Sequence, residues 1–269
     1  MEQPKNNFKI VSDKKARMIL PNAITLIGVC VGLSSIKFAL DGKFALSIAG
    51  ILVAALMDAL DGRIARLIKG TSKMGKELDS LGDVISFGVA PAFIMYFWSL
   101  QYLDKLGWFV CLIYVVCVAL RLARFNVSSS EEPSWKDNFF EGTPAPAGGI
   151  IVLIPLIINF SGFDEIFIKI NYDMIVPIFF IIVSILLIST IPTYSFKKIV
   201  IPRRMTKFLL FGIVLFFGAL LIYTFKILVL TSFIYLCLIP ISYFHYKKIK
   251  KDKNIISEKN ENEELEDIL

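Results

Sequence analysis

The sequence predicts an all-α polytopic membrane protein with eight transmembrane helices and both termini in the cytoplasm. Of the 269 residues, 56% are hydrophobic, and the mean hydropathy of +0.68 is too high for an ordinary soluble domain. Long uncharged runs approach the roughly 20 residues that a helix needs to cross a bilayer, and basic residues are distributed unevenly between these runs. These observations exclude a secreted disulfide scaffold, a disordered protein and an ordinary soluble enzyme.

Eight uncharged runs are the candidate spans. They are, in order, Met18–Ile36, Phe44–Met57, Val84–Leu103, Leu106–Leu120, Gly142–Phe163, Met174–Phe196, Phe208–Phe225 and Ile227–Phe244. Six are long enough to span alone, whereas Phe44–Met57 and Leu106–Leu120 are short and lead directly into charged residues. Ionisable groups near membrane depth are costly, so the charges that follow these two runs are candidate functional residues.

The distribution of lysine and arginine gives the expected orientation. With both termini in the cytoplasm, 24 of the 29 basic residues fall on the inner side of the membrane. An excess of positive charge in cytoplasmic segments is the usual pattern, and it agrees here with an even number of spans.

The two ends of the chain differ in composition from the membrane domain, which we place at residues 18–246. Residues 1–17 form a basic cytoplasmic segment, in which apolar and basic positions alternate from Phe8 onward. This pattern fits either an interfacial helix on the anionic inner leaflet or a simple basic flank. Residues 247–269 form a charged tail, first basic and then acidic, which we expect to be solvated and disordered.

Four aspartates carry the candidate chemistry. Asp58 and Asp61 are three residues apart, and Asp79 and Asp83 are four apart, so each pair lies on one face of its helix. We expect a turn between the two helices to bring all four carboxylates together near the inner membrane surface. Divalent cations that prefer oxygen ligands, such as two Mg²⁺ or Mn²⁺ ions, would relieve the repulsion between them. Two such ions are a known arrangement for in-line displacement at phosphorus.

The residues around the aspartates suit a phosphate-bearing ligand. Gly62 permits close approach to the backbone, Arg66 can bind a phosphate with two parallel hydrogen bonds, and Ser72 offers a hydroxyl. Ala65 keeps the same region narrow, and Gly75 offers backbone contacts on the connecting turn. The single histidine, His245, lies at the end of the last span, so a general base at the membrane interior must be a carboxylate. Paired membrane carboxylates also serve as cation relays in transporters, and this alternative remains open.

The spacing of these residues resembles a known signature. The pattern Asp58-x-x-Asp61-Gly62-x-x-Ala65-Arg66, followed by Gly75, Asp79 and Asp83, matches all eight fixed positions, over 26 residues, of the CDP-alcohol phosphatidyltransferase family. In that family an alcohol attacks the diacylglycerol-bearing phosphate of a CDP-linked lipid, and CMP leaves.

The resemblance assigns roles to individual residues. It implies that Asp58, Asp61 and Asp79 hold a first divalent metal, and that Asp83 helps to bind a second and acts as general base. It places Gly62, Ala65, Arg66 and Ser72 beside the CDP moiety, with Gly75 on the same turn. Pro21-Asn22-x-x-Thr25 is similar to the family's first-helix signature, which puts Asn22 and Thr25 near the nucleotide. Alternatively, Asn22 caps the first helix.

Further segments resemble the membrane-type phosphatidylserine synthases of this family. They are Asp79 to Ala92, Arg121 to Asn126, Phe140 to Ala147 and Ile191 to Lys197, within a resemblance that covers residues 20–200. Gly82 departs from the alanine usual at its position, and the last two spans carry no recognisable motif. The resemblance implies CDP-diacylglycerol and L-serine as substrates, a homodimer, and a bacterial or archaeal inner membrane with the active site facing the cytoplasm.

The acceptor alcohol is less sharply indicated than the chemistry. Arg121 and Arg124 could bind the carboxylate of serine, with Asn126 beside them. Inositol phosphate or glycerol phosphate would also require arginine, and both arginines could instead anchor the membrane edge or pair with Glu141. The glycine- and proline-rich segment Gly142–Gly149 is expected to be irregular and to line the polar pocket.

Overall fold

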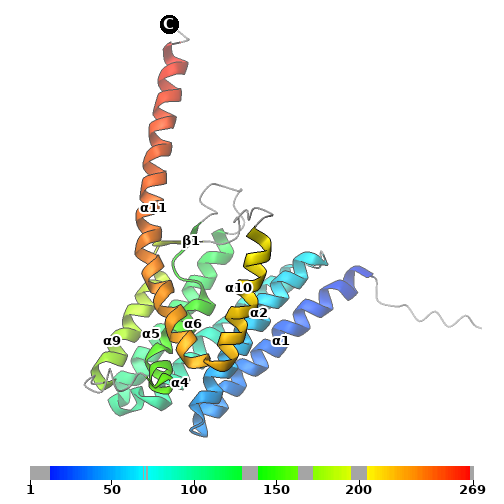
Figure 1. Ribbon diagram of the computed structural model, residues 1–269, viewed down its shortest axis with the longest axis vertical. Helices are drawn as coiled ribbons and strands as arrows, with labels where there is room; N and C mark the ends of the chain where they lie inside the picture. The colour runs from blue at the N-terminus through cyan, green and yellow to red at the C-terminus, as the bar shows by residue number, and fades with distance from the viewer. Residues whose placement is uncertain are drawn as a thin grey trace, which may run out of the picture.

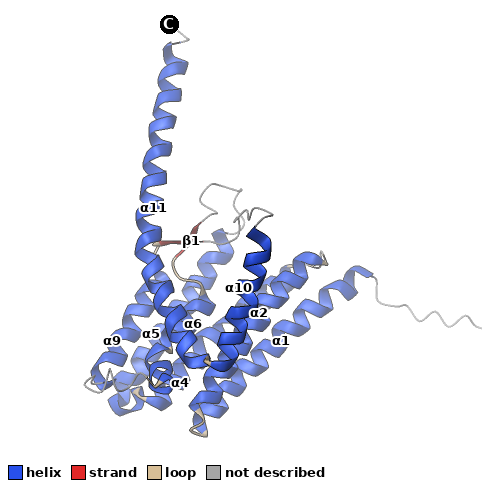
Figure 2. Cartoon of the chain, viewed as in Figure 1, coloured by secondary structure: helices blue, strands red, loops and turns tan. Residues whose placement is uncertain are grey.

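The computed structural model describes residues 13–68, 70, 72–128, 139–162, 172–194 and 205–266. Helices make up almost all of this part of the chain (Figures 1 and 2). They are α1 (Asp13–Leu40), α2 (Phe44–Leu67), α3 (Lys73–Asp83), η1 (Val84–Val89), α4 (Ala90–Trp98), η2 (Leu100–Leu103), α5 (Asp104–Ser128), α6 (Ala145–Val152), α7 (Ile154–Ser161), α9 (Tyr172–Ile188), α10 (Thr206–Ile222) and α11 (Thr224–Glu266). Two short strands, β1 (Phe139–Glu141) and β2 (Pro192–Tyr194), pair antiparallel.

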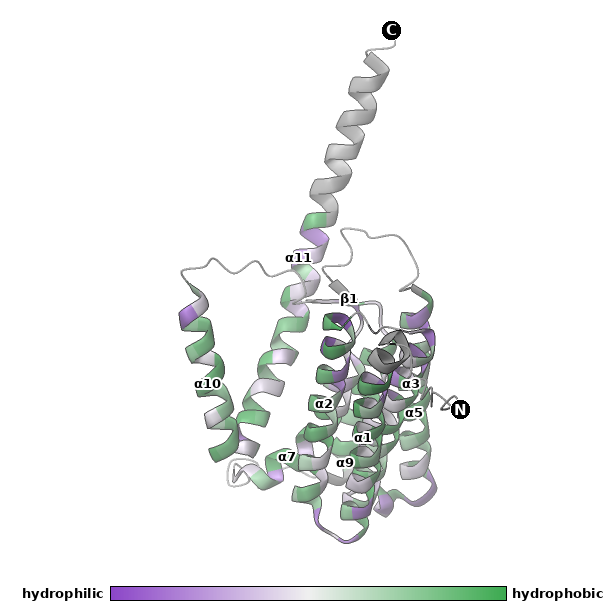
Figure 3. Cartoon of the chain, turned by 90° about the vertical axis from the view of Figure 1, so that its right-hand side faces the viewer, coloured by the Kyte–Doolittle hydropathy of each residue, from purple (hydrophilic) through white to green (hydrophobic). Residues whose placement is uncertain are grey.

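The helical, membrane-spanning class predicted from the sequence is confirmed. Five stretches are long and apolar enough to cross a membrane, namely Ile19–Leu40, Phe44–Leu67, Lys73–Trp98, Leu100–Val127 and Thr224–Ile249. Met174–Ile188 and Thr206–Ile222 are shorter apolar helices. Figure 3 shows hydrophobic residues along the helices and hydrophilic ones gathered at the end where β1 lies and in the loops at the opposite end.

The helices that carry the aspartates extend beyond the uncharged runs. The second uncharged run ends at Met57, and α2 continues to Leu67, so Asp58 and Asp61 lie inside one helix as expected from their spacing. Likewise α3, η1 and α4 join into one continuous helix from Lys73 to Trp98. Helix formation depends on backbone propensity and packing rather than on the absence of charge, and α1 packs along α2 over most of its length.

The π-helix η1 follows directly after Asp83. The backbone N–H of Ala90 donates to the carbonyl of Ile85, five residues earlier, rather than to the residue four earlier. Such a wide turn disturbs the regular hydrogen-bond ladder, and the buried Tyr114 hydroxyl of α5 donates to the carbonyl oxygen of Phe87 at 2.8 Å. A hydrogen bond from another helix thus stabilises this turn. The spacing of hydrophobic residues in the sequence did not predict a π-turn at this position.

Two sequence expectations for the segment after β1 were wrong. The run Gly142–Phe163 forms two helices, α6 and α7, that meet at Leu153, where Pro155 in the first turn of α7 cannot donate a backbone hydrogen bond. The segment Gly142–Gly149 is irregular only as far as Pro144. Helix α6 starts at Ala145, because Pro146 fits the first turn of a helix, where its missing N–H costs nothing.

The ends of the chain differ in part from the expectation. Helix α1 begins at Asp13, while the interfacial helix proposed from Phe8 onward starts outside the described residues. The tail was expected to be disordered from residue 247, but α11 continues as a helix to Glu266 and extends away from the other helices (Figure 1). The tail has no glycine or proline and is rich in lysine and glutamate, which favour helix.

Candidate active site

Three aspartates from two helices converge at one place. One carboxylate oxygen each from Asp58, Asp61 and Asp79 lies within 4.8 Å of the other two. Asp61 is 3% exposed, and the other two are half-buried. The convergence agrees with the helical spacing, which puts Asp58 and Asp61 on one face of α2, while α1 packs against both α2 and α3.

Asp83 lies beside this cluster, one turn after Asp79 on the same helix. Asp58 faces both Asp79 and Asp83 across the boundary between α2 and α3. Within the described residues, no lysine or arginine nitrogen lies within 4.0 Å of these carboxylates; the one salt bridge found there joins Lys37 and Asp41. The negative charge of the cluster is therefore not balanced by direct ion pairs.

This donor set fits a hard divalent cation. Carboxylate oxygens are the ligands that Mg²⁺ and related ions prefer, and three of them already lie at mutual distances that one ion could bridge. The Thr25 hydroxyl of α1 donates to Oδ2 of Asp61 at 2.5 Å and also lies 3.1 Å from the carbonyl of Pro21. Such a hydrogen bond fixes the direction of the Asp61 carboxylate in the way that outer partners fix metal ligands.

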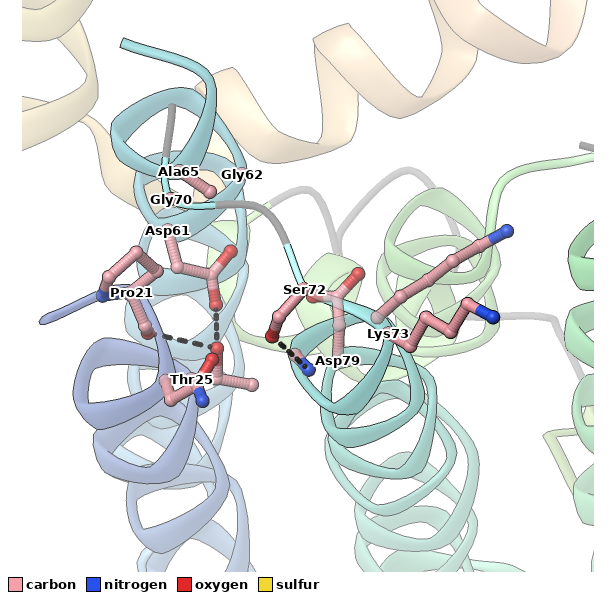
Figure 4. A pocket seen from close by; sticks show the side chains of 12 residues that line it. Pro21, Thr25, Asp61, Gly62, Ala65, Gly70, Ser72, Lys73 and Asp79 are labelled. Carbon is pink, nitrogen blue, oxygen red and sulfur yellow. Dashed lines mark hydrogen bonds between the residues drawn. The ribbon is translucent and has the colours of Figure 1, made fainter. Parts of the chain in front are cut away.

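A cavity of about 500 Å³ opens next to the carboxylates (Figure 4). It is lined by Pro21, Asn22, Thr25, Asp61, Gly62, Ala65, Gly70, Ser72, Lys73, Gly75, Lys76 and Asp79. The structure thus brings together six of the seven residues expected to bind the nucleotide. A Cβ built on Gly62 would meet no protein atom within 4 Å, so this backbone faces open space that a ligand can occupy.

The first turn of α3 forms one wall of the cavity. Ser72 and Gly75 were expected on a connecting turn, but Ser72 is the N-cap of α3 and its side chain accepts a hydrogen bond from the Gly75 backbone at 2.9 Å. Lys73 and Lys76 add two cationic side chains that the sequence analysis missed. Their three-residue spacing, continued by Asp79, would have placed them on one helix face.

Arg66 is the predicted nucleotide-binding residue that does not line the cavity. Its side chain is exposed at the last turn of α2, and its Nε donates to the carbonyl of Gly62 at 3.0 Å. The guanidinium therefore lies against the backbone of Gly62, which lines the cavity, without lining the cavity itself.

The three residues expected to bind serine lie in different environments. The guanidinium of Arg124 donates to the carbonyls of Ile188 and Ser189 at 2.8 and 3.1 Å, and so holds the end of α9. Nδ2 of Asn126 donates to the Ser80 hydroxyl at 2.9 Å. Arg121 is only 7% exposed and faces Asp83. Of the three, Arg121 is the one directed toward the carboxylates.

Comparisons with known proteins agree with this geometry. A family model described as CDP-alcohol phosphatidyltransferase matches residues 18–186. Three similar proteins all carry the name CDP-diacylglycerol–serine O-phosphatidyltransferase. That of Mycobacterium leprae is 35% identical over 229 residues, which is 82% of this chain and 73% of the relative. That of Mycobacterium tuberculosis is 36% identical over 226 residues, 82% and 77% of the two chains. That of Helicobacter pylori is 34% identical over 181 residues, which is 67% of this chain and 74% of the relative.

Proposed function

Because this chain belongs to the CDP-alcohol phosphatidyltransferase family, we propose that it transfers the phosphatidyl group of CDP-diacylglycerol to L-serine, forming phosphatidylserine and CMP. The observation that carries the proposal is the cluster of Asp58, Asp61 and Asp79 at the wall of a cavity large enough for a nucleotide. The names of the similar proteins support serine as the acceptor, in preference to inositol phosphate or glycerol phosphate.

The aspartates would hold the metal that this chemistry requires. Asp58, Asp61 and Asp79 would be the ligands of a first Mg²⁺ or Mn²⁺ ion, and Asp83 would contribute to a second. Bound divalent ions supply neutralising charge for the pyrophosphate and for the departing CMP. The protein contributes fixed ligand positions on two rigid helices, so no reorganisation is needed at the moment of reaction.

Asp83 is the proposed general base. It lies one helical turn after Asp79, facing Asp58, and takes the proton from the serine hydroxyl. The serine oxygen then forms a bond to the phosphorus that carries diacylglycerol, and the bond from that phosphorus to the bridging pyrophosphate oxygen breaks. CMP leaves with the bonding electron pair. A positioned base of this kind contributes roughly 10²–10⁴-fold, so orientation and electrostatics supply the rest of the acceleration.

The cavity residues hold the donor substrate. Thr25, Gly62 and Gly75 present hydroxyl and backbone groups to the CDP moiety, together with Asn22, Ala65 and Ser72. Lys73 and Lys76 supply positive charge at the wall of the cavity that α3 forms. Arg66, exposed beside Gly62, reaches the pyrophosphate from the rim once the substrate is bound.

The proposal includes an arrangement in the membrane. The chain crosses eight times with both termini in the cytoplasm, residues 18–246 form the membrane domain, and the carboxylates face the cytoplasm of a bacterial or archaeal cell. The protein works as a homodimer. The excess of lysine and arginine on one side supports this orientation.

An assay of the protein purified in detergent tests the function. We expect CMP release from CDP-diacylglycerol that requires both L-serine and Mg²⁺ or Mn²⁺. Release with inositol phosphate or glycerol phosphate instead of serine would assign a different acceptor. No release with any alcohol would contradict transferase activity and favour the cation-coupled transporter.

Replacement of the base separates binding from chemistry. Asp83→Asn keeps the shape of the side chain but removes its ability to accept the serine proton, so we expect turnover to fall at least 100-fold. Equilibrium binding of CDP-diacylglycerol should remain. Asp41→Asn, at an exposed aspartate paired with Lys37, is the matched control and should retain full activity. Near-normal turnover in Asp83→Asn would remove Asp83 as the base.

A further inference from the structure

Three buried polar atoms, one of them on a side chain that faces Asp83, have no hydrogen-bond partner within the described structure. They are Nε of Arg121, Oγ1 of Thr143 and the hydroxyl oxygen of Tyr235. They come from three separate parts of the fold, since Arg121 lies on α5, Thr143 follows β1, and Tyr235 lies on α11. Buried polar groups in proteins are nearly always paired, so three unpaired ones at one place require an explanation.

These three side chains form one cluster. The Tyr235 hydroxyl lies beside the side chains of Thr143 and Thr193 without reaching hydrogen-bond geometry, and Arg121 is close enough to interact with it electrostatically. Arg121 in turn interacts with Asp83. The cluster thus extends from the proposed general base to the last helix of the chain.

The surrounding backbone holds Thr143 in this position. Gly142 has a φ of +72°, which favours glycine, and its N–H donates to the Ile191 carbonyl at 2.9 Å. The Thr193 hydroxyl donates to the carbonyl of Gly142 at 2.8 Å. Thr193 and Arg124 therefore donate hydrogen bonds to backbone carbonyls around Thr143. In contrast, the Thr143 hydroxyl and Nε of Arg121 have no partner in the described structure.

The chemistry of the cluster is that of an anion site. A guanidinium N–H and two hydroxyls can all donate, and no described carboxylate lies within 4.0 Å of the buried Arg121. A buried cation without a direct ion pair is costly, and a ligand carboxylate would satisfy both the charge and the donors. The position beside Asp83 limits the ligand to one that also presents a hydroxyl to the base.

We infer that Arg121, Thr143 and Tyr235 bind the carboxylate of the acceptor amino acid. This assignment rests on the proposed function and deepens it, because it replaces Arg124 and Asn126 as serine-binding residues and brings α11 into the site. Serine lies with its hydroxyl toward Asp83 and its carboxylate toward Arg121. An amino alcohol that lacks the carboxylate leaves the three donors unpaired and is rejected.

Kinetics of the full-length protein in detergent test the assignment. Tyr235→Phe removes one hydrogen bond to a charged group, so we expect the KM for L-serine to rise about 10-fold or more. The KM for CDP-diacylglycerol should not change. Tyr243→Phe is the matched control, since Tyr243 is on the same helix but exposed, and it should behave like the wild type.

A second acceptor distinguishes carboxylate binding from a general loss of structure. L-Serinamide keeps the hydroxyl and the amine but carries a neutral amide, so wild-type kcat/KM should be at least 10-fold lower for it than for serine. In Tyr235→Phe and Arg121→Lys this ratio should approach one. Equal losses for both acceptors, or an unchanged serine KM in Tyr235→Phe, would overturn the assignment. Absence of serine-dependent CMP release from the wild type would instead contradict the proposed function.

Discussion

At the scale of single residues, the hydrogen bond from Thr25 to Asp61 links the first helix to the carboxylate cluster. Thr25→Val keeps the side-chain shape but removes the hydroxyl that donates to Asp61 from α1. Loss of such an outer partner typically costs 10–100-fold in metal affinity, so we expect the half-saturating Mg²⁺ or Mn²⁺ concentration to rise by that factor. Activity titrated against metal concentration measures it, and saturating metal should restore most of the turnover.

A second threonine provides the control for this substitution. Thr231 donates only to the carbonyl of Leu228 within α11, far along the chain from the aspartates. Thr231→Val should leave the metal titration unchanged. If Thr25→Val gives the same midpoint as the wild type, Thr25 does not position Asp61 for an ion.

The residue scale also shows where sequence reasoning succeeds. The three- and four-residue spacings of the aspartates depend only on helix geometry, and they predicted the cluster before its neighbours were known. The contact between Thr143 and Tyr235 joins residues 92 positions apart and depends on how α11 packs against β2. The local spacing of residues in the sequence cannot predict such a long-range contact.

At the scale of elements, the π-turn η1 receives a hydrogen bond from Tyr114 of α5. Tyr114→Phe leaves the buried carbonyl of Phe87 without its donor, which typically costs about 1–3 kcal/mol. We expect a lower melting temperature in detergent for this variant. Tyr102→Phe, at a tyrosine that is 75% exposed, should melt like the wild type. Equal melting temperatures for the two variants would show that the turn forms without the Tyr114 hydroxyl.

The π-turn η1 and the joint at Leu153 are the parts of the helical fold that the sequence did not predict. Hydrophobic runs give the number and the approximate position of the helices, because each helix must present apolar side chains to lipid or to its neighbours. They do not give the joint at Leu153 or the extra residue of η1, since both depend on backbone hydrogen bonds that break the 3.6-residue period.

At the scale of the whole molecule, the proposed orientation can be tested by labelling. In a background without the four natural cysteines, Lys43→Cys lies at the exposed α1–α2 connection and Glu77→Cys lies on the exposed face of α3. With the active site in the cytoplasm, a membrane-impermeant maleimide added to intact cells should label position 43 and not position 77. Labelling of position 77 before permeabilisation would reverse the orientation.

The three clustered aspartates come from two different helices. This affects the stability of the protein as well as its chemistry. An ion held by Asp58 and Asp61 of α2 and by Asp79 of α3 is a removable cross-link between two neighbouring helices. Any ligand that binds only the folded state raises the free energy of unfolding, by about 2.7 kcal/mol at a concentration one hundred times its Kd. With such an ion bound, the folded state would be coupled to the supply of divalent cations, and we expect chelation to lower the free energy of unfolding before any substrate is present.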